Sequence, residues 1–140
     1  MSKIFFYGLF MDRTLLTEKG LHPEIIGPAV LPDYRIHIGE RATLLRSASS
    51  RAYGIVMALP DREARALYSE PSVREYIRER VQVELSDSSE TVEAYCYNLP
   101  PELGLAGTNP AYAARLSQLV EALQFDPAYV EEIAAFGEVS

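Results

Sequence analysis

The sequence is poor in residues that cross-link small folds or bind metals: its 140 residues include one cysteine, two histidines and no tryptophan. Cys96 alone cannot form an internal disulfide, and no group of Cys and His has the spacing of zinc ligands. A disulfide-rich secreted domain and a structural zinc site are therefore excluded. A single thiol fits a reducing compartment, so we expect the protein to be cytoplasmic.

Long hydrophobic runs and positive charge are also scarce. No segment approaches the roughly 20 apolar residues that cross a bilayer, and the N-terminus lacks the pattern of a signal peptide. We therefore expect no association with a membrane. Only 13 Lys and Arg oppose 20 Asp and Glu, the net charge is −7, and the basic residues are scattered along the chain. Because such a surface repels phosphate backbones, nucleic acid is not an expected partner.

Apolar material is plentiful, at 48% of the residues, and a chain of this length suits one domain, residues 1–140. The apolar and aromatic run 3–7 is closed by Gly8, which predicts a buried strand that ends in a turn. Asp12 is expected to cap a short helix, and Gly20 stands where that helix ends. The N-terminal unit is therefore predicted to be strand, turn and helix.

Strands are predicted for most of the first two thirds of the chain. Alternation and β-branched residues indicate four segments, 29–31, 34–38, 42–45 and 53–59. The clearest hairpin follows, with strands at 81–85 and 92–96 joined by a polar turn.

Helices are predicted at three further places. Asp61 is expected to cap a short helix that ends before Pro71. After a loop over 100–110, apolar residues at helical spacing predict a helix from Tyr112 to Leu123, and a second one after Asp126 and Pro127. The expected fold class is α+β with a strongly curved or closed sheet.

The first candidate site is the turn after the first strand. Several backbone N–H groups around residues 8 to 11 can converge there, and the following helix adds positive potential, which would suit a carboxylate. The alternative is an ordinary turn whose donors are satisfied by the Asp12 side chain and by water.

The second candidate is Glu70. Pro71 forces its backbone away from helical geometry, and burial among Tyr68, Tyr76 and Phe6 would raise the pKa of its carboxyl and suit it to general acid–base chemistry. The alternative is an exposed glutamate that pairs with Arg74 or Arg78.

Three further features are weaker candidates. Cys96 lies in the middle of a predicted strand, where a small thiol packs, although a thiol enzyme stays open as a hypothesis. His22 and His37 are interpreted as loop and surface residues. Arg41, Arg46 and Arg51 form either a basic patch for an anion or a solvated strand edge.

Four segments together resemble the γ-glutamylcyclotransferase-like superfamily, which includes an AIG2-like branch. The segments are 6–11 (Phe-Tyr-Gly-Leu-Phe-Met), 52–56 (Ala-Tyr-Gly-Ile-Val), 67–70 (Leu-Tyr-Ser-Glu) and 76–83. The likeness extends over most of the chain, including residues 109–112 and the two helices after them. It implies a small mixed β-barrel flanked by helices, in agreement with the α+β prediction.

The resemblance also implies residue roles. Backbone amides of Gly8, Leu9 and Phe10 in the turn after Tyr7, and of Met11 beyond it, would bind the glutamyl head group. Glu70 would be the catalytic acid and base, and Tyr76 would line the substrate site. Most members carry Ser or Thr at the position of Leu9, so in this chain only backbone donors remain there. Members often carry Gly at the position of Pro71, which stiffens the backbone beside Glu70.

The implied reaction is internal aminolysis, in which the substrate's α-amine attacks its own γ-amide carbonyl to give 5-oxoproline and a free amine. No cofactor is needed because the nucleophile is tethered to the reacting carbonyl. The expected partner is therefore a small γ-glutamyl compound. The alternative is a noncatalytic ligand-binding or interaction domain that keeps the pocket. The sequence is compatible with a homodimer and does not fix the oligomeric state.

Overall fold

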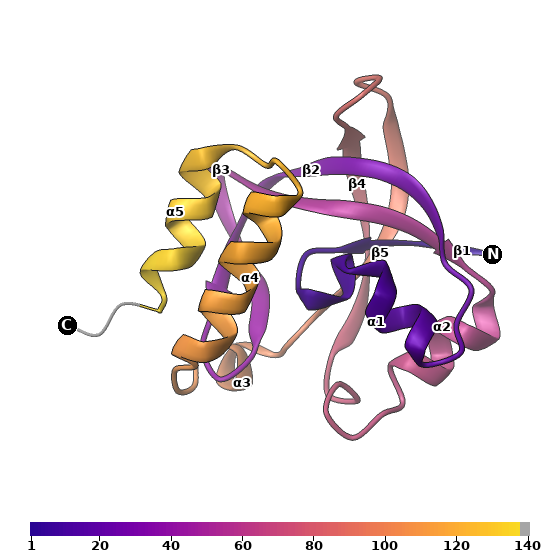
Figure 1. The fold of residues 1–140 in the computed structure, drawn as a ribbon, viewed down its shortest axis with the longest axis horizontal. Coiled ribbons are helices and arrows are strands. Elements are labelled where there is room, and N and C mark those ends of the chain that lie inside the picture. The colour runs from indigo at the N-terminus through magenta and orange to yellow at the C-terminus, as the bar shows by residue number, and fades with distance from the viewer. Residues whose placement is uncertain (138–140) are drawn as a thin grey trace.

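Five strands close into a barrel in the order β1-β3-β2-β4-β5 (Figure 1). The structure, a computed structural model, describes residues 1–137. Neighbouring strands are antiparallel except β1 and β5, which meet in parallel where Ile4 pairs with Tyr95. The prediction of an α+β domain with a closed sheet is confirmed. The strands are β1 (Ser2–Phe6), β2 (Glu24–Ile38), β3 (Ala42–Leu59), β4 (Ile77–Leu85) and β5 (Thr91–Asn98).

The longest hairpin corrects the prediction of four short strands between residues 29 and 59. β2 and β3 are continuous and pair from Ile38 with Ala42 to the far end, with an irregularity between Pro32 and Tyr34. Proline lacks the N–H that a ladder needs, and a bulge absorbs that loss. At this bulge Asp33 has a φ of +64°, and its carboxylate accepts from the Ser49 amide at 3.2 Å. The proline therefore bends the strand without ending it.

The barrel interior holds the main core. Phe5, Met57, Val83 and Cys96 are at most 1% exposed. Gly54 on β3 lies directly against β1: a Cβ there would overlap the Phe6 carbonyl and approach the ring of Phe5. The absence of a side chain at this position lets the first strand close against the barrel.

The helices surround the barrel, and the predicted cap at Asp12 is confirmed. The Asp12 side chain accepts from the Thr14 amide at 3.0 Å, and Asp126 does the same for Ala128 at 2.9 Å. The prediction for Asp61 is wrong: Pro60 occupies the cap, and the Asp61 carboxylate accepts from the Ser2 hydroxyl at 2.7 Å. The helices are η1 (Leu9–Met11), α1 (Arg13–Glu18), α2 (Asp61–Leu67), α3 (Pro101–Gly104), α4 (Pro110–Ala122) and α5 (Pro127–Ala135).

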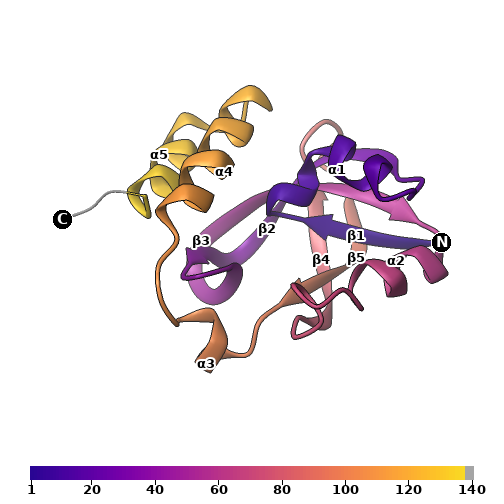
Figure 2. The same ribbon diagram turned by 60° about the horizontal axis from the view of Figure 1, so that its bottom comes forward.

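The segment between β5 and α4 was expected to be entirely loop, but it contains the single turn α3 (Figure 2). Pro101 stands at the first position of this helix, where a missing N–H costs nothing.

The C-terminal helices α4 and α5 lie side by side against the β2–β3 hairpin in both views (Figures 1 and 2). Tyr129 anchors α5 there, because its ring lies 4.6 Å from that of Tyr53 and its hydroxyl donates to the Tyr53 carbonyl. This packing brings Tyr112, on α4, to the turn after β1. No helix within residues 1–137 has the length and apolarity needed to cross a membrane.

Candidate active site

A cavity of about 310 Å³ opens where β1 leads into η1. Four parts of the chain line it: the turn after β1, the β2–β3 turn, the segment between α2 and β4, and the end of β5 together with the start of α4. The predicted substrate residues Tyr7, Gly8, Leu9, Phe10 and Tyr76 all belong to this lining. The structure therefore brings together two regions that the sequence separates by more than sixty residues.

Residues 8–10 of the turn after β1 line the cavity. The Leu9 amide donates to the Tyr112 hydroxyl at 3.4 Å, and the Met11 amide donates to the Gly8 carbonyl at 3.0 Å. Met11 is also buried and does not line the cavity. Gly8 is needed because a Cβ there would lie 2.7 Å from the Tyr112 oxygen. Of the four residues predicted to contribute amides, Gly8, Leu9 and Phe10 line the cavity and Met11 does not.

Aromatic rings form most of the remaining wall. Tyr68 and Tyr97 stack face to face with centroids 3.6 Å apart, and Tyr76 lies 6.4 Å from Tyr68. The Tyr7 hydroxyl donates to the Tyr97 carbonyl at 2.7 Å, and the Tyr76 hydroxyl donates to the Ala42 carbonyl. These bonds fix the directions of both phenols.

Burial keeps these phenols neutral. Desolvation raises the pKa of Tyr7, Tyr68 and Tyr76 above the ordinary value of 10.0. Each hydroxyl is therefore a hydrogen-bond donor throughout the pH range in which the protein works, and none of the three is a proton-accepting base.

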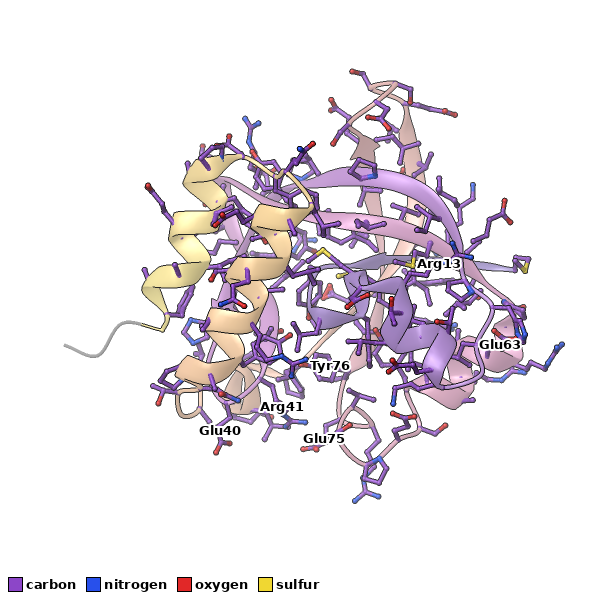
Figure 3. The ribbon with its side chains drawn as sticks, in the orientation of Figure 1. Arg13, Glu40, Arg41, Glu63, Glu75 and Tyr76 are labelled. Carbon is purple, nitrogen blue, oxygen red and sulfur yellow. The ribbon has the colours of Figure 1, made fainter. Side chains whose placement is uncertain are left out.

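Charged side chains gather on the cavity at one place, around the turn between β2 and β3 (Figure 3). Glu40 and Arg41 line the cavity there, and Arg41 forms a two-point ion pair with Glu75, with N–O distances of 3.1 and 3.3 Å. Its Nη1 also donates to the Ser72 carbonyl at 3.3 Å. Of the three arginines considered as a basic patch, only Arg41 reaches the cavity, and its charge is balanced.

Glu70 does not line the cavity. Its carboxylate instead binds Lys19 of the α1 C-terminus, with Nζ–O distances of 2.8 and 3.1 Å, and its side chain is 36% exposed. The expected burial among Tyr68, Tyr76 and Phe6 is therefore wrong, as is the alternative pairing with Arg74 or Arg78. Lys19 lies 51 positions away in the chain, so the sequence did not reveal this partner. Its neighbours Tyr68, Ser72 and Val73 do line the cavity, so its backbone lies at the rim.

Cys96 is buried in the barrel and takes no part in the cavity lining. Burial raises the pKa of its thiol above the ordinary value, so the reactive thiolate is disfavoured. This removes the support for a thiol enzyme. No group of three or more metal-binding side chains occurs within residues 1–137.

Among the lining residues that sequence reasoning missed are four polar or aromatic ones: Glu40, Tyr97, Asn109 and Tyr112. Two of them had a usable signal. Asn109 precedes a proline at a helix start, the pattern of an N-cap, and its side chain does accept from the Tyr112 amide at 3.0 Å. That cap fixes the first turn of α4, from which Tyr112 reaches the cavity. Nothing local in the sequence signalled Glu40 or Tyr97.

Solved structures share this fold. One named "Gamma-glutamyl cyclotransferase" superimposes with a TM-score of 0.77 at 14% identity, over 96% of this chain and 86% of that chain. The structure of YkqA from Bacillus subtilis superimposes with a TM-score of 0.78 at 20% identity, over 97% of this chain and 54% of that chain. The structure of an AIG2-like protein from Mus musculus superimposes with a TM-score of 0.61 at 17% identity, over 73% of this chain and 81% of that chain. At sequence identities of 20% or less, this structural similarity supports the fold alone.

A comparison with curated protein sequences gave no match. The family model described as "Gamma-glutamyl cyclotransferase, AIG2-like" matches residues 4–115, which include the turn after β1, Glu70, the aromatic wall and Tyr112. The chain therefore belongs to the γ-glutamyl cyclotransferase, AIG2-like family.

Proposed function

We propose that this protein is an enzyme that cyclises a γ-glutamyl amide to 5-oxoproline and releases the amine. The observation that carries the proposal is the cavity itself: residues 8–10 of the turn after β1, the aromatic wall and Tyr76 all line one space of about 310 Å³. Such a volume, lined mainly by apolar surface with a few directed donors, is typical of a small-molecule site.

In the proposed reaction the substrate's α-amine attacks its own γ-carbonyl carbon. A C–N bond forms, the carbonyl π electrons move to oxygen, and collapse of this intermediate breaks the bond to the leaving nitrogen. The α-ammonium loses one proton before it attacks and a second as the lactam forms. The leaving nitrogen takes up one of these protons when its bond breaks, and the other passes to the free amine or to solvent, so one group that repeatedly accepts and returns a proton suffices. The chain contributes by folding the substrate into a ring-closing conformer, which raises the effective concentration of the nucleophile.

Each part of the cavity has a role in this proposal. The amides around Leu9 and Phe10 hold the α-carboxylate or the developing oxyanion. The Tyr112 hydroxyl, which accepts from the Leu9 amide, keeps its own O–H to donate to the substrate, and Tyr76 with the stacked Tyr68 and Tyr97 excludes water from the aliphatic part of the substrate.

Glu70 is proposed as the proton shuttle. Its pairing with Lys19 means that the carboxylate must turn inward before it can act, over the rim to which Tyr68 and Ser72 belong. The substrate's own α-ammonium is the cation that would replace Lys19 as its partner. A carboxylate 36% exposed is free enough to make this exchange.

The test is 5-oxoproline release from γ-glutamyl amines and γ-glutamyl amino acids. Glu70→Gln, which keeps the shape of the side chain, is expected to lower turnover by roughly 100-fold or more, the usual contribution of a proton-transferring group. Thermal unfolding of the variant serves as the control for folding. Undiminished turnover by a folded Glu70→Gln protein contradicts this role.

The second candidate function is ligand binding without catalysis, which the outward position of Glu70 favours. It predicts that γ-glutamyl compounds raise the melting temperature of the protein while no 5-oxoproline accumulates. Binding with turnover supports the first proposal, and binding without turnover supports the second.

A further inference from the structure

The proposed function assigns the glutamyl head group to residues 8–10 and gives no role to the mouth of the cavity. We use this name for the exposed end of the cavity, which Glu40 and Arg41 line. Phe5 and Tyr7, at 1% and 6% exposure, form the inner wall, whereas Glu40 is exposed and the Arg41 side chain is 30% exposed. A substrate with its head group at the turn after β1 therefore extends its leaving amine toward Glu40 and Arg41. These two residues are the charged groups of the lining.

Arg41 contributes little net charge to the mouth. Its guanidinium is held end-on by both oxygens of Glu75 and by the Ser72 carbonyl, and it lies 5.9 Å from the centre of the Tyr76 ring. A two-point pair of this kind fixes the arginine and cancels its charge at short range.

Glu40, in contrast, is positioned but not neutralised. Its amide donates to the Ala106 carbonyl at 2.9 Å, and its carbonyl accepts from the Asn109 side chain at 3.1 Å. Gly107, with a φ of +71°, packs against the side chain so closely that a Cβ there would lie 2.5 Å from Glu40 Cγ. The carboxylate has no hydrogen bond or ion pair with any residue in the described range 1–137. The unbalanced charge at the mouth is therefore negative.

We infer that Glu40 makes the enzyme prefer γ-glutamyl amides whose leaving amine carries a second, positively charged group, such as an aliphatic diamine. The inference rests on the proposed function and names the substrate class of the same cavity. An anionic leaving group would instead meet Glu40 and find Arg41 already occupied by Glu75.

Three substrates of nearly equal length separate charge from size: γ-glutamyl-1,4-diaminobutane, γ-glutamyl-n-butylamine and γ-glutamyl-4-aminobutyrate. We expect kcat/KM to fall in that order, from cationic to neutral to anionic. An exposed charge pair is worth up to about 1 kcal/mol, so each step corresponds to roughly fivefold. The preference should weaken as salt is raised, because screening acts on exposed charges.

Two variants test the assignment to Glu40. In Glu40→Gln the ratio of kcat/KM for the cationic and neutral substrates should fall to near one. In Glu75→Gln the released Arg41 should shift the preference toward the anionic substrate. The control is Glu84→Gln, an exposed glutamate on β4 outside the cavity lining, which makes the same change in net charge and should keep the wild-type ratio.

Binding of the same three compounds, measured by calorimetry, keeps the two proposals distinguishable. If none of them yields 5-oxoproline, the proposed function fails, while a binding preference for the cation that disappears in Glu40→Gln still supports the mouth assignment. If turnover occurs without charge preference, or the preference survives Glu40→Gln, the inference is wrong and the cyclotransferase proposal stands.

Discussion

At the scale of single residues, Glu70 already binds a primary ammonium, that of Lys19. Both side chains are 36% exposed, so the pair stabilises the fold by at most about 1 kcal/mol. A pair this weak is compatible with exchange for a substrate ammonium. In the proposed mechanism, Lys19 would compete with the substrate for the carboxylate.

The first prediction follows for Lys19→Met. Removing the competing cation should raise kcat/KM for a γ-glutamyl amide by about two- to fivefold, because opening the pair no longer costs up to about 1 kcal/mol. Initial rates of 5-oxoproline release measure the effect. Lys3→Met, an exposed lysine on β1, is the control for the loss of one positive charge. A Lys19→Met enzyme as slow as Glu70→Gln would show instead that Lys19 takes part in the reaction.

At the scale of elements, the sequence predicted correctly those features that depend on residues close together in the chain. The β4–β5 hairpin, with Val83 paired to Val92, and the cap Asp12 depend on residues within a few positions of one another. β2 and β3 were predicted as fragments because their continuity depends on partner strands. The bond from the Ser49 amide to the Asp33 side chain, which fills a gap in that ladder, joins residues 16 positions apart.

Barrel closure at Gly54 gives the second prediction. Gly54→Ala should destabilise the protein by about 1–3 kcal/mol, because the new methyl group is forced against the Phe6 carbonyl and the Phe5 ring. Urea unfolding measures the change. Phe5→Leu removes part of the collision, so the double variant should lose less stability than the sum of the two single variants. If the stability losses of the two single variants simply add in the double variant, the collision of the new methyl group is not relieved by shortening Phe5.

The start of α4 gives the third prediction. Asn109→Ala removes the cap on Tyr112 and the bond to the Glu40 carbonyl, whereas Asp126→Ala removes the cap of α5 and a 3.5 Å bond from the Tyr53 hydroxyl, both outside the cavity lining. Each should cost about 1 kcal/mol of stability. Only Asn109→Ala should also raise KM, since Tyr112 and Glu40 belong to the cavity. Equal KM values in the two variants would contradict this link between the cap and the site.

At the scale of the whole molecule, the site depends on contacts that no local pattern encodes. Glu70 and Lys19 are 51 positions apart, and Glu40 and Asn109 are 69 positions apart. The turn after β1 and Tyr76 were predictable through the family resemblance. The mouth was not, because Glu40 becomes a site residue only when the β2–β3 turn meets the segment before α4.

Another distant contact, between α2 and the segment before β2, gives the last prediction. The Glu63 carboxylate accepts from the His22 ring at 2.9 Å and from the His22 amide at 2.6 Å, although Glu63 is only 8% exposed. These two hydrogen bonds lower the pKa of Glu63 below its ordinary value of 4.5, and the bond from the His22 ring has the larger effect. A carboxyl whose pKa is depressed by folding adds stability above its unfolded pKa, and this stability is lost as the pH falls through the folded value.

Wild-type stability should therefore drop more steeply below pH 4.5 than that of Glu63→Gln, which cannot titrate at this position. Urea unfolding of both proteins between pH 7 and pH 3 measures the difference. The Asp61 carboxyl, whose pKa is lowered mainly by the Ser2 hydroxyl, titrates in both proteins and cancels in the comparison. The difference in unfolding free energy between wild type and variant should stay constant above pH 4.5 and shrink below it. Parallel curves throughout would mean that the Glu63–His22 contact does not persist in solution.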